Sequence, residues 1–161
     1  AYTEVIRKKT AELFQAAAQT GALLAGADTA VVTALRDYGH HLGMAFQLVD
    51  DALDYGGDAG QLGKNIGDDL AEGKMTLPLI HTLRTASAAD ATLIRAAIAN
   101  RDGAALPDVL RIVGACGALD YTLTVARQQA GRALAALAPL PASPQQQALC
   151  ELAEFAADRD F

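Results

Sequence analysis

The chain has 161 residues, of which 52% are hydrophobic, enough to bury the core of one domain and to exclude wholesale disorder. Only 5% of the residues are aromatic and alanine is abundant, which favours close-packed helices over a β-sandwich or β-barrel. The formal net charge of −6 argues against sequence-independent binding of nucleic acid, because such binding needs an excess of Lys and Arg. No apolar run approaches the ~20 residues of a transmembrane helix and no signal peptide is recognisable, so we expect a cytoplasmic protein with no transmembrane segment and no nucleic-acid partner.

Helical periodicity runs through the whole chain, and the predicted fold class is all-α. The first residues already lie inside an amphipathic pattern, so we expect the chain to be the trailing part of something longer. Residues 3–25 are predicted to form one helix and residues 28–55 a second. Asp28 is the expected N-cap of the second helix, because its carboxylate can accept the free N–H groups of the first turn. Apolar residues then recur at steps of three and four and mark a buried stripe: Val31, Leu35, Tyr38, Leu42, Phe46, Val49 and Leu53.

A glycine-rich loop carrying Lys64 is predicted over residues 56–67. Further helices are predicted at 75–86, 90–100, 107–115, 118–138 and 145–158, with Pro78 and Pro107 near the start of their helices. Cys116 and Cys150 lie far apart, outside any CxxC motif, so we expect reduced, buried thiols rather than a zinc site or a disulfide.

The segment most informative about chemistry begins with three aspartates near the end of the second helix. Asp50, Asp51 and Asp54 form a DDxxD motif, whose spacing puts Asp54 on the same face as both earlier carboxylates. At an exposed site, their mutual repulsion and the negative end of the helix dipole each cost about a few tenths to one kcal/mol. A cation would compensate, and clustered carboxylates suit Mg²⁺, which completes its shell with water and substrate phosphates.

A solvated acidic helix end is the alternative interpretation of this motif. The apolar run FQLV directly before the acids argues against ordinary surface, and Lys64 and Lys74 follow within GKN and EGK. Carboxylates that hold a metal, with lysines close by, suit a diphosphate. An EF-hand is excluded because Ala52 and Gln61 stand where it needs oxygen ligands, and a Walker A loop because Asn65 replaces its Ser or Thr.

Three separated signatures carry a resemblance to a known family. They are YTEVIRKKTAELF at the start, GMAFQLVDDALDY with the aspartates, and LGKNIGDDLAEGKMTLPLI after them. In this order and spacing, residues 1–161 resemble the C-terminal half of a trans-isoprenyl (polyprenyl) diphosphate synthase, most similar to the bacterial enzymes that make octaprenyl or decaprenyl chains. The resemblance implies part of a single all-α helical bundle of the isoprenoid-synthase type, a homodimer in the complete enzyme, and an N-terminal half, carrying a first aspartate-rich motif, that is absent from these residues.

The resemblance also implies roles for individual residues. Asp50 resembles the aspartate that ligates Mg²⁺ directly, and Asp51 and Asp54 resemble its supporting or water-mediated partners. The lysines that resemble the family's holders of the allylic diphosphate are Lys9, Lys64 and Lys74. The residues that resemble those lining the meeting place of the allylic carbon and isopentenyl diphosphate are Thr10, Phe46 and Gln47.

Other polar residues receive structural interpretations. Asp68 and Asp69 are expected to cap the next helix and to pair with lysines. His40, His41 and His81 are expected to be structural or exposed, because nothing pairs them with a nucleophile. Arg159 resembles the family's basic C-terminal tail, although the chain ends in Phe161.

The predicted activity is transfer of an allylic prenyl group to isopentenyl diphosphate, which builds a long-chain polyprenyl diphosphate, with this chain inactive by itself. The alternative is a non-catalytic helical subunit of a heteromeric synthase, which the complete set of aspartates and lysines disfavours. A terpene cyclase is disfavoured because the KT and GKN signatures do not belong to its usual pattern.

Overall fold

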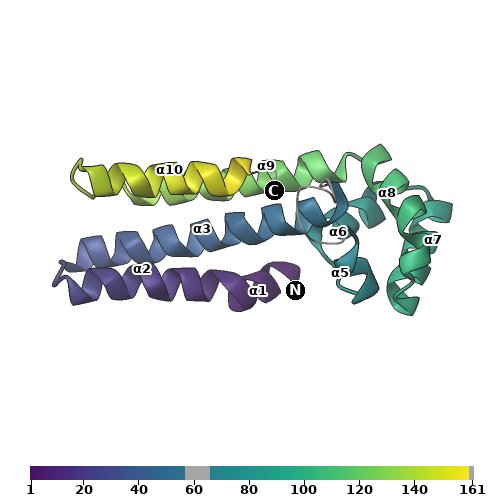
Figure 1. Ribbon diagram of the computed structural model, residues 1–161, viewed down its shortest axis with the longest axis horizontal. Helices are drawn as coiled ribbons and strands as arrows, with labels where there is room; N and C mark the ends of the chain where they lie inside the picture. Colours follow the sequence, from purple (N-terminus) through teal and green to yellow (C-terminus); the bar gives the residue numbers. More distant parts are fainter. Residues whose placement is uncertain (57–65, 160–161) are drawn as a thin grey trace. The chain divides into compact units, whose positions relative to one another are not determined.

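A computed structural model describes residues 1–56 and 66–159. Within these residues every regular element is helical, which confirms the predicted all-α class (Figure 1). In chain order the elements are α1 (Tyr2–Ile6), a π-helical turn (Arg7–Ala11), α2 (Glu12–Leu24), α3 (Thr29–Gly56), α5 (Asp68–Ala71), α6 (Leu77–Thr85), α7 (Ala88–Asn100), a 3₁₀ turn (Gly103–Ala105), α8 (Leu106–Ala115), α9 (Ala118–Ala136) and α10 (Pro144–Asp158).

The predicted second helix and its cap are confirmed. The Asp28 carboxylate accepts the backbone N–H of Val31 at 2.9 Å, directly before α3. The preceding helix α2 ends where Gly26 adopts the left-handed conformation at φ 67°, and the N–H of Ala27 reaches back to the carbonyl of Ala22. These local signals explain why the turn between α2 and α3 was predictable from sequence.

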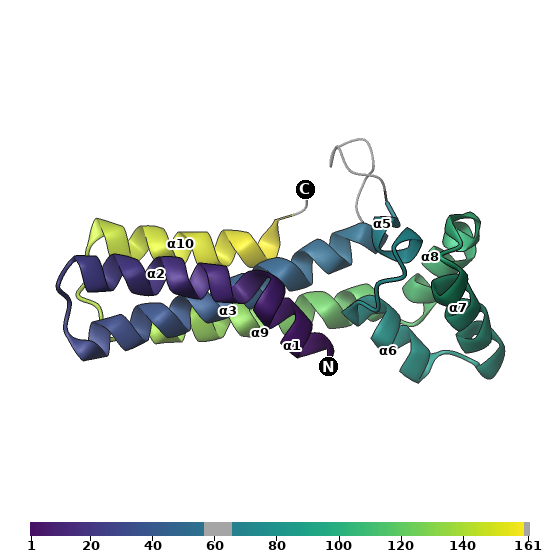
Figure 2. The same ribbon diagram turned by 90° about the horizontal axis from the view of Figure 1, so that it is seen from below.

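Contacts divide the chain into two compact units, and the first comprises Ala1, residues 3–49 and residues 125–159. In both views α2, α3, α9 and α10 lie side by side in this unit (Figures 1 and 2). Its core is built from small and medium side chains, which suits closely packed helices. The buried members are Tyr38, Leu42, Ala133, Leu137, Ala153 and Ala156, with Ala45, Ala130 and Ala157 in a second cluster.

Two glycines let α3 approach the preceding helical segment closely. A Cβ at Gly39 would lie 2.5 Å from the carbonyl oxygen of Phe14, and one at Gly43 would lie 2.6 Å from the Cα of Ala11. Neither contact is possible for a larger residue unless the backbone moves. The pair therefore fixes where the π-helical turn meets the middle of α3.

The second unit comprises Tyr2 and residues 50–124, within the described part of the chain. It contains the end of α3, the short helices α5 to α8 and the beginning of α9 (Figure 2). A larger apolar core holds it together: Tyr55, Leu70, Leu79, Ile94, Ala97, Val109, Ile112, Val113 and Ala118 are all buried. Pro78 and Pro107 lie in the first turns of α6 and α8, as the sequence predicts.

None of the described helices is by itself long and apolar enough to cross a membrane. Taken together, the segments Gly103–Ala115 and Ala118–Ala136 have the length and apolar composition of a membrane-spanning helix, with a 65° bend between them.

Candidate functional site

The segment that carries Lys9 and Thr10 is not the regular α-helix that the sequence predicts. Residues Arg7–Ala11 form a π-helical turn between α1 and α2. Arg7 makes ion pairs with Glu4 before the turn and with Glu12 five residues later. A wider turn brings residues five apart into register, and single π-helical turns inside α-helices are frequent at functional sites. The predicted helix over residues 3–25 is confirmed in extent, because residues 2–24 are helical throughout, but the π-helical turn within it was not predicted.

Within the first unit, the turn presents Thr10 to α3. Thr10 Oγ1 donates a hydrogen bond to Gln47 Oε1 at 2.6 Å, and the Gln47 side chain is buried. The close approach at Gly43, one helical turn before Gln47, permits this contact. Two of the three residues predicted to line the reacting carbon are thus brought together.

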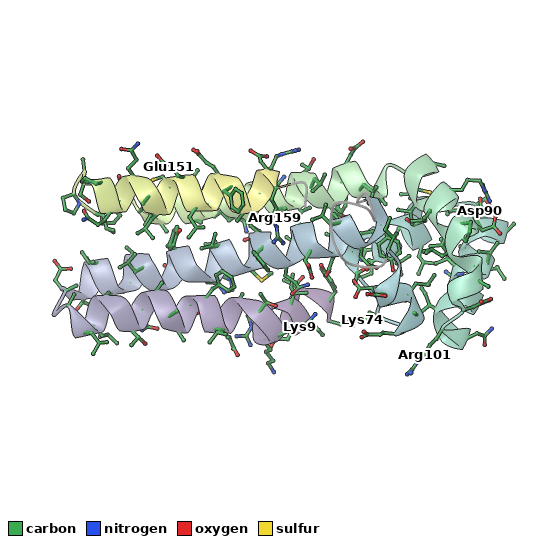
Figure 3. The ribbon with its side chains drawn as sticks, viewed as in Figure 1. Lys9, Lys74, Asp90, Arg101, Glu151 and Arg159 are labelled. Carbon is green, nitrogen blue, oxygen red and sulfur yellow. The ribbon has the colours of Figure 1, made fainter. Side chains whose placement is uncertain are left out.

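The third, Phe46, lies in an aromatic and cationic cluster. The centroid of the Phe46 ring lies 5.5 Å from the centroid of the Phe14 ring. The guanidinium of Arg159, the residue after α10, lies 3.8 Å from the Phe46 centroid. Arg159 also donates to the Phe46 carbonyl at 2.9 Å, and Figure 3 shows it between α10 and α3. Arg159 thus ties the end of the described chain to the middle of α3.

In the second unit, Asp51 is a buried carboxylate with a specific partner. Its side chain is 3% exposed, and the Tyr2 hydroxyl donates to Oδ2 at 2.5 Å. Burial, followed by the charge of Asp51, raises the pKa of Tyr2, whereas a backbone hydrogen bond with Leu77 lowers it. The phenol therefore stays protonated and able to donate to Asp51.

Asp54 occupies a different environment in the same unit. Its Oδ2 accepts the backbone N–H of Asp69 at 3.1 Å, at the beginning of α5. Burial, and then the negative charges of Asp69 and Asp68, raise the pKa of Asp54 to about 6. The surroundings of Asp54 therefore disfavour its ionised form, chiefly because the carboxylate is removed from water.

Asp68 and Asp69 behave only in part as predicted. Asp69 pairs with Lys74, whose Nζ lies 3.0 Å from Oδ1, and Lys74 also reaches Glu72 at 2.7 Å. Neither aspartate caps α5 through its side chain; the N-cap is Gly67, at φ 86°, and the carboxylate on the first turn comes from Asp54. The capping prediction was wrong because a left-handed residue precedes the aspartates and places them inside the first turn.

The three predicted lysines are in different situations. Hydrogen bonds to Glu72 and Asp69 raise the pKa of Lys74, so it is fully charged and occupied by acids. Lys9 is exposed on the π-helical turn (Figure 3). Lys64 lies outside the described residues. Their assignment to a diphosphate stays a prediction.

The predicted Mg²⁺ site is not preformed. Among residues 1–56 and 66–159, no group of three or more His, Cys, Asp or Glu side chains is arranged to hold a metal ion. The donor chemistry nevertheless fits a hard divalent cation, because the carboxylates of Asp50, Asp51 and Asp54 all come from the end of α3 and hard cations prefer oxygen ligands. The assignment of Asp50, Asp51 and Asp54 to Mg²⁺ stays a prediction.

The histidines have structural contacts. His41 Nδ1 lies 2.8 Å from Gln129 Oε1, and the His81 ring stacks on Tyr121 at 4.2 Å between centroids. His40 makes an edge contact with the His41 ring. Both cysteines are free thiols, although they are partly exposed rather than buried.

Three residues that shape these groups were not predicted from the sequence: Gly39, Gly43 and Tyr2. Gly39 and Gly43 stand four residues apart on α3, and this small-residue spacing is a signal of close helix approach. Tyr2 acts on Asp51, 49 residues away, and no local pattern announces such a contact.

Comparison with known proteins extends these observations. The family model described as Polyprenyl synthetase matches residues 1–113. The chain is 49% identical over 160 residues to octaprenyl diphosphate synthase of Escherichia coli, covering 99% of this chain and 50% of that protein. It is 46% identical over 158 residues to the all-trans-nonaprenyl-diphosphate synthase of Rhodobacter capsulatus, covering 98% and 48% respectively.

The fold agrees with solved structures of the same class. A polyprenyl synthase from Caulobacter crescentus, complexed with calcium and isoprenyl diphosphate, is 49% identical with a TM-score of 0.94, covering 99% of this chain and 49% of that one. A decaprenyl diphosphate synthase from Rhodobacter capsulatus is 40% identical with a TM-score of 0.90, covering 99% and 50%. The chain spans about half the length of the curated relatives it matches. On the family model and these identities, the chain belongs to the polyprenyl synthetase family.

Proposed function

We propose that this chain supplies part of the catalytic machinery of a prenyltransferase, which condenses isopentenyl diphosphate with an allylic prenyl diphosphate to make a long-chain all-trans polyprenyl diphosphate. The observation that carries the proposal is the acidic end of α3, where Asp51 and Asp54 are each held by a specific donor in a chain 49% identical to an octaprenyl diphosphate synthase. The named products of the relatives support a long-chain product.

The proposed cofactor is Mg²⁺, held by Asp50 with help from Asp51 and Asp54. The calcium and isoprenyl diphosphate in the related Caulobacter structure support a divalent cation and a diphosphate ligand. When bound, the cation would neutralise negative charge that develops on the diphosphate as its C–O bond ionises.

The residues of the chain have separate tasks in this reaction. Lys9, Lys64 and Lys74 bind diphosphate oxygens, and Lys74 must exchange Glu72 or Asp69 for them. Thr10 and Gln47, fixed by their hydrogen bond, and the Phe46 ring line the reacting allylic carbon in an apolar setting that excludes water. The double bond of isopentenyl diphosphate attacks that carbon, and the proton released from the new chain passes to the departing diphosphate. No side-chain nucleophile takes part.

The proposed assembly in the complete enzyme is a cytoplasmic homodimer, in which this chain works with a segment equivalent to the other half of its relatives. The exposed Val5, Leu13 and Leu24 side chains on α1 and α2 support an association surface. The free thiols support a reducing compartment.

A heteromeric synthase in which this chain is a non-catalytic subunit is the second candidate. The 36% identity to a Geobacillus stearothermophilus protein named heptaprenyl diphosphate synthase component 2 supports a synthase of more than one component, and that name does not say which component is catalytic. The two candidates differ in whether the aspartates of α3 are needed for turnover.

The test is an assay of the full-length protein with isopentenyl diphosphate, a short allylic diphosphate and Mg²⁺, with product length measured by chromatography after dephosphorylation. We expect polyprenyl products, abolished by a chelator and restored by excess Mg²⁺. The 161-residue chain alone serves as the control and should give none. Absence of product from the full-length protein, or robust turnover by the isolated chain, would contradict the proposal.

A further inference from the structure

A hydrogen bond between the Tyr2 hydroxyl and the Asp51 carboxylate links the beginning of the chain to the aspartate motif. The donor–acceptor distance is 2.5 Å, in the range of charge-assisted O–H···O⁻ bonds. Asp51 is 3% exposed, so its carboxylate depends on protein groups for the hydrogen bonds that water would otherwise give. A buried carboxylate that loses a donor is strongly disfavoured in its present position.

The phenol also lies beside the backbone of Leu77, the first residue of α6, which lowers the pKa of Tyr2 against the larger effect of burial. The Tyr2 side chain is thus next to the beginning of α6 as well as bonded to the end of α3, within the second unit.

Two other buried hydroxyls of the second unit do not bind the Asp51 carboxylate. Tyr55 Oη and Thr76 Oγ1 are also buried, and Thr76 is near enough to lower the pKa of Tyr55, but neither hydroxyl donates to Asp51. Tyr55 lies close enough to feel the charge of Asp51 but does not donate to it. Among the hydroxyls of Tyr2, Tyr55 and Thr76, the one that donates to Asp51 is therefore that of Tyr2.

We propose that Tyr2 is a positioning residue, whose hydroxyl holds the Asp51 carboxylate in the orientation needed for divalent-cation binding at the end of α3. This inference rests on the proposed function of the aspartate motif. Groups that hydrogen-bond a metal-binding side chain orient it, and their removal typically weakens metal affinity by about 10- to 100-fold. Tyr2 would touch neither cation nor substrate and would act only through Asp51.

The experiment compares Tyr2→Phe, Asp51→Asn and the double variant in the full-length protein. Tyr38→Phe is the matched control, because the Tyr38 hydroxyl is also partly buried and donates to the Leu149 carbonyl at 2.8 Å, away from the aspartates. Each protein is titrated calorimetrically with Mg²⁺ in the presence of inorganic pyrophosphate, and the heat of Mg²⁺–pyrophosphate complexation without protein is subtracted. Melting temperature and the Mg²⁺ dependence of turnover are measured alongside.

Tyr2→Phe should weaken Mg²⁺ binding about tenfold or more and raise the Mg²⁺ concentration for half-maximal turnover in parallel. Tyr38→Phe should lower the melting temperature while leaving Mg²⁺ binding unchanged. The double variant should bind Mg²⁺ no more weakly than Asp51→Asn alone, because Tyr2 acts through Asp51.

Wild-type Mg²⁺ affinity in Tyr2→Phe, additive losses in the double variant, or no Mg²⁺ binding by the wild type would overturn the inference. The calorimetric result is independent of prenyl transfer. If the wild type makes no polyprenyl product but Tyr2→Phe still weakens Mg²⁺–pyrophosphate binding, the proposed function fails and the role of Tyr2 stands.

Discussion

The Asp54 carboxylate on α3 accepts the backbone N–H of Asp69, at 3.1 Å, in the first turn of α5. A residue that the motif assigns to a metal thus also holds the first turn of α5. The two tasks are compatible, because a carboxylate has two oxygens and several lone pairs.

This relationship predicts a pH-dependent stability. Burial and the charges of Asp69 and Asp68 raise the pKa of Asp54 to about 6, above the value of about 4 in an unfolded chain. The folded state therefore binds this proton more tightly, so the contribution of Asp54 destabilises the fold above pH ~6 and vanishes as the pH falls towards 4. Asp54→Asn keeps an acceptor oxygen and should raise the melting temperature at pH 7.5 more than at pH 5. An equal change at both pH values would contradict this.

The close approach between Gly43 and Ala11 predicts the effect of adding one methyl group. Gly43→Ala places a Cβ 2.6 Å from the Ala11 Cα and should destabilise the fold by about 1–3 kcal/mol. Gly21→Ala is the control, because a Cβ there meets nothing within 4 Å and the residue lies inside α2. That change should stabilise by about 0.4–1 kcal/mol. Denaturant unfolding of both variants measures the difference; a neutral Gly43→Ala would refute the packing argument.

The Thr10–Gln47 hydrogen bond predicts a loss of turnover that exceeds the loss of stability. In the full-length protein, Thr10→Val should reduce kcat on the order of tenfold or more, because Gln47, which we propose lines the reacting carbon, then loses the hydroxyl that holds it. Thr122→Val removes another buried hydroxyl, which donates to the Ala118 carbonyl at 2.8 Å, and should affect only stability. Steady-state kinetics with melting curves compares the two. Equal effects on kcat would show that Thr10 has only a structural role.

Exposed apolar side chains predict the behaviour of the isolated chain. Leu13 and Leu24 are 75% and 85% exposed on α2, and Val5 is exposed on α1. We expect the 161-residue chain to self-associate, because contact with another copy would remove these exposed apolar side chains from water. Sedimentation at increasing concentration measures this, and Leu13→Gln with Leu24→Gln should reduce it. A strictly monomeric chain at high concentration would contradict the prediction.

The long helix α3 was predictable because its signals are local. Asp28 caps it, the apolar stripe repeats at steps of three and four, and the helix continues through the aspartates to Gly56. The short helix α5 shows the limit of the same reasoning. Asp68 and Asp69 at the start of a helix indicate side-chain capping, yet the N-cap is Gly67. The carboxylate that accepts a backbone N–H of the first turn belongs to Asp54, fifteen residues before Asp69.

The parts of the candidate site that escaped prediction depend on distant contacts. The π-helical turn is stabilised by Arg7 and Glu12 and meets α3 at Gly43, so it follows from packing rather than helix propensity. Tyr2 and Asp51 meet across 49 residues. The motif identifies the aspartates as candidate ligands, but their hydrogen-bond donors, Tyr2 for Asp51 and the Asp69 N–H for Asp54, are seen only in the folded chain.

The most direct measurement is the turnover of the full-length protein with Asp50 intact and with Asp50→Asn, at saturating isopentenyl and allylic diphosphates over a range of Mg²⁺ concentrations. If Asp50 ligates Mg²⁺, the variant should lose turnover by orders of magnitude, because metal stabilisation of the transition state is worth several kcal/mol. Its apo melting temperature should hold or rise slightly, because the amide relieves like-charge repulsion, and Asp54→Asn should be less impaired. Unchanged turnover and unchanged Mg²⁺ dependence in Asp50→Asn would contradict the account.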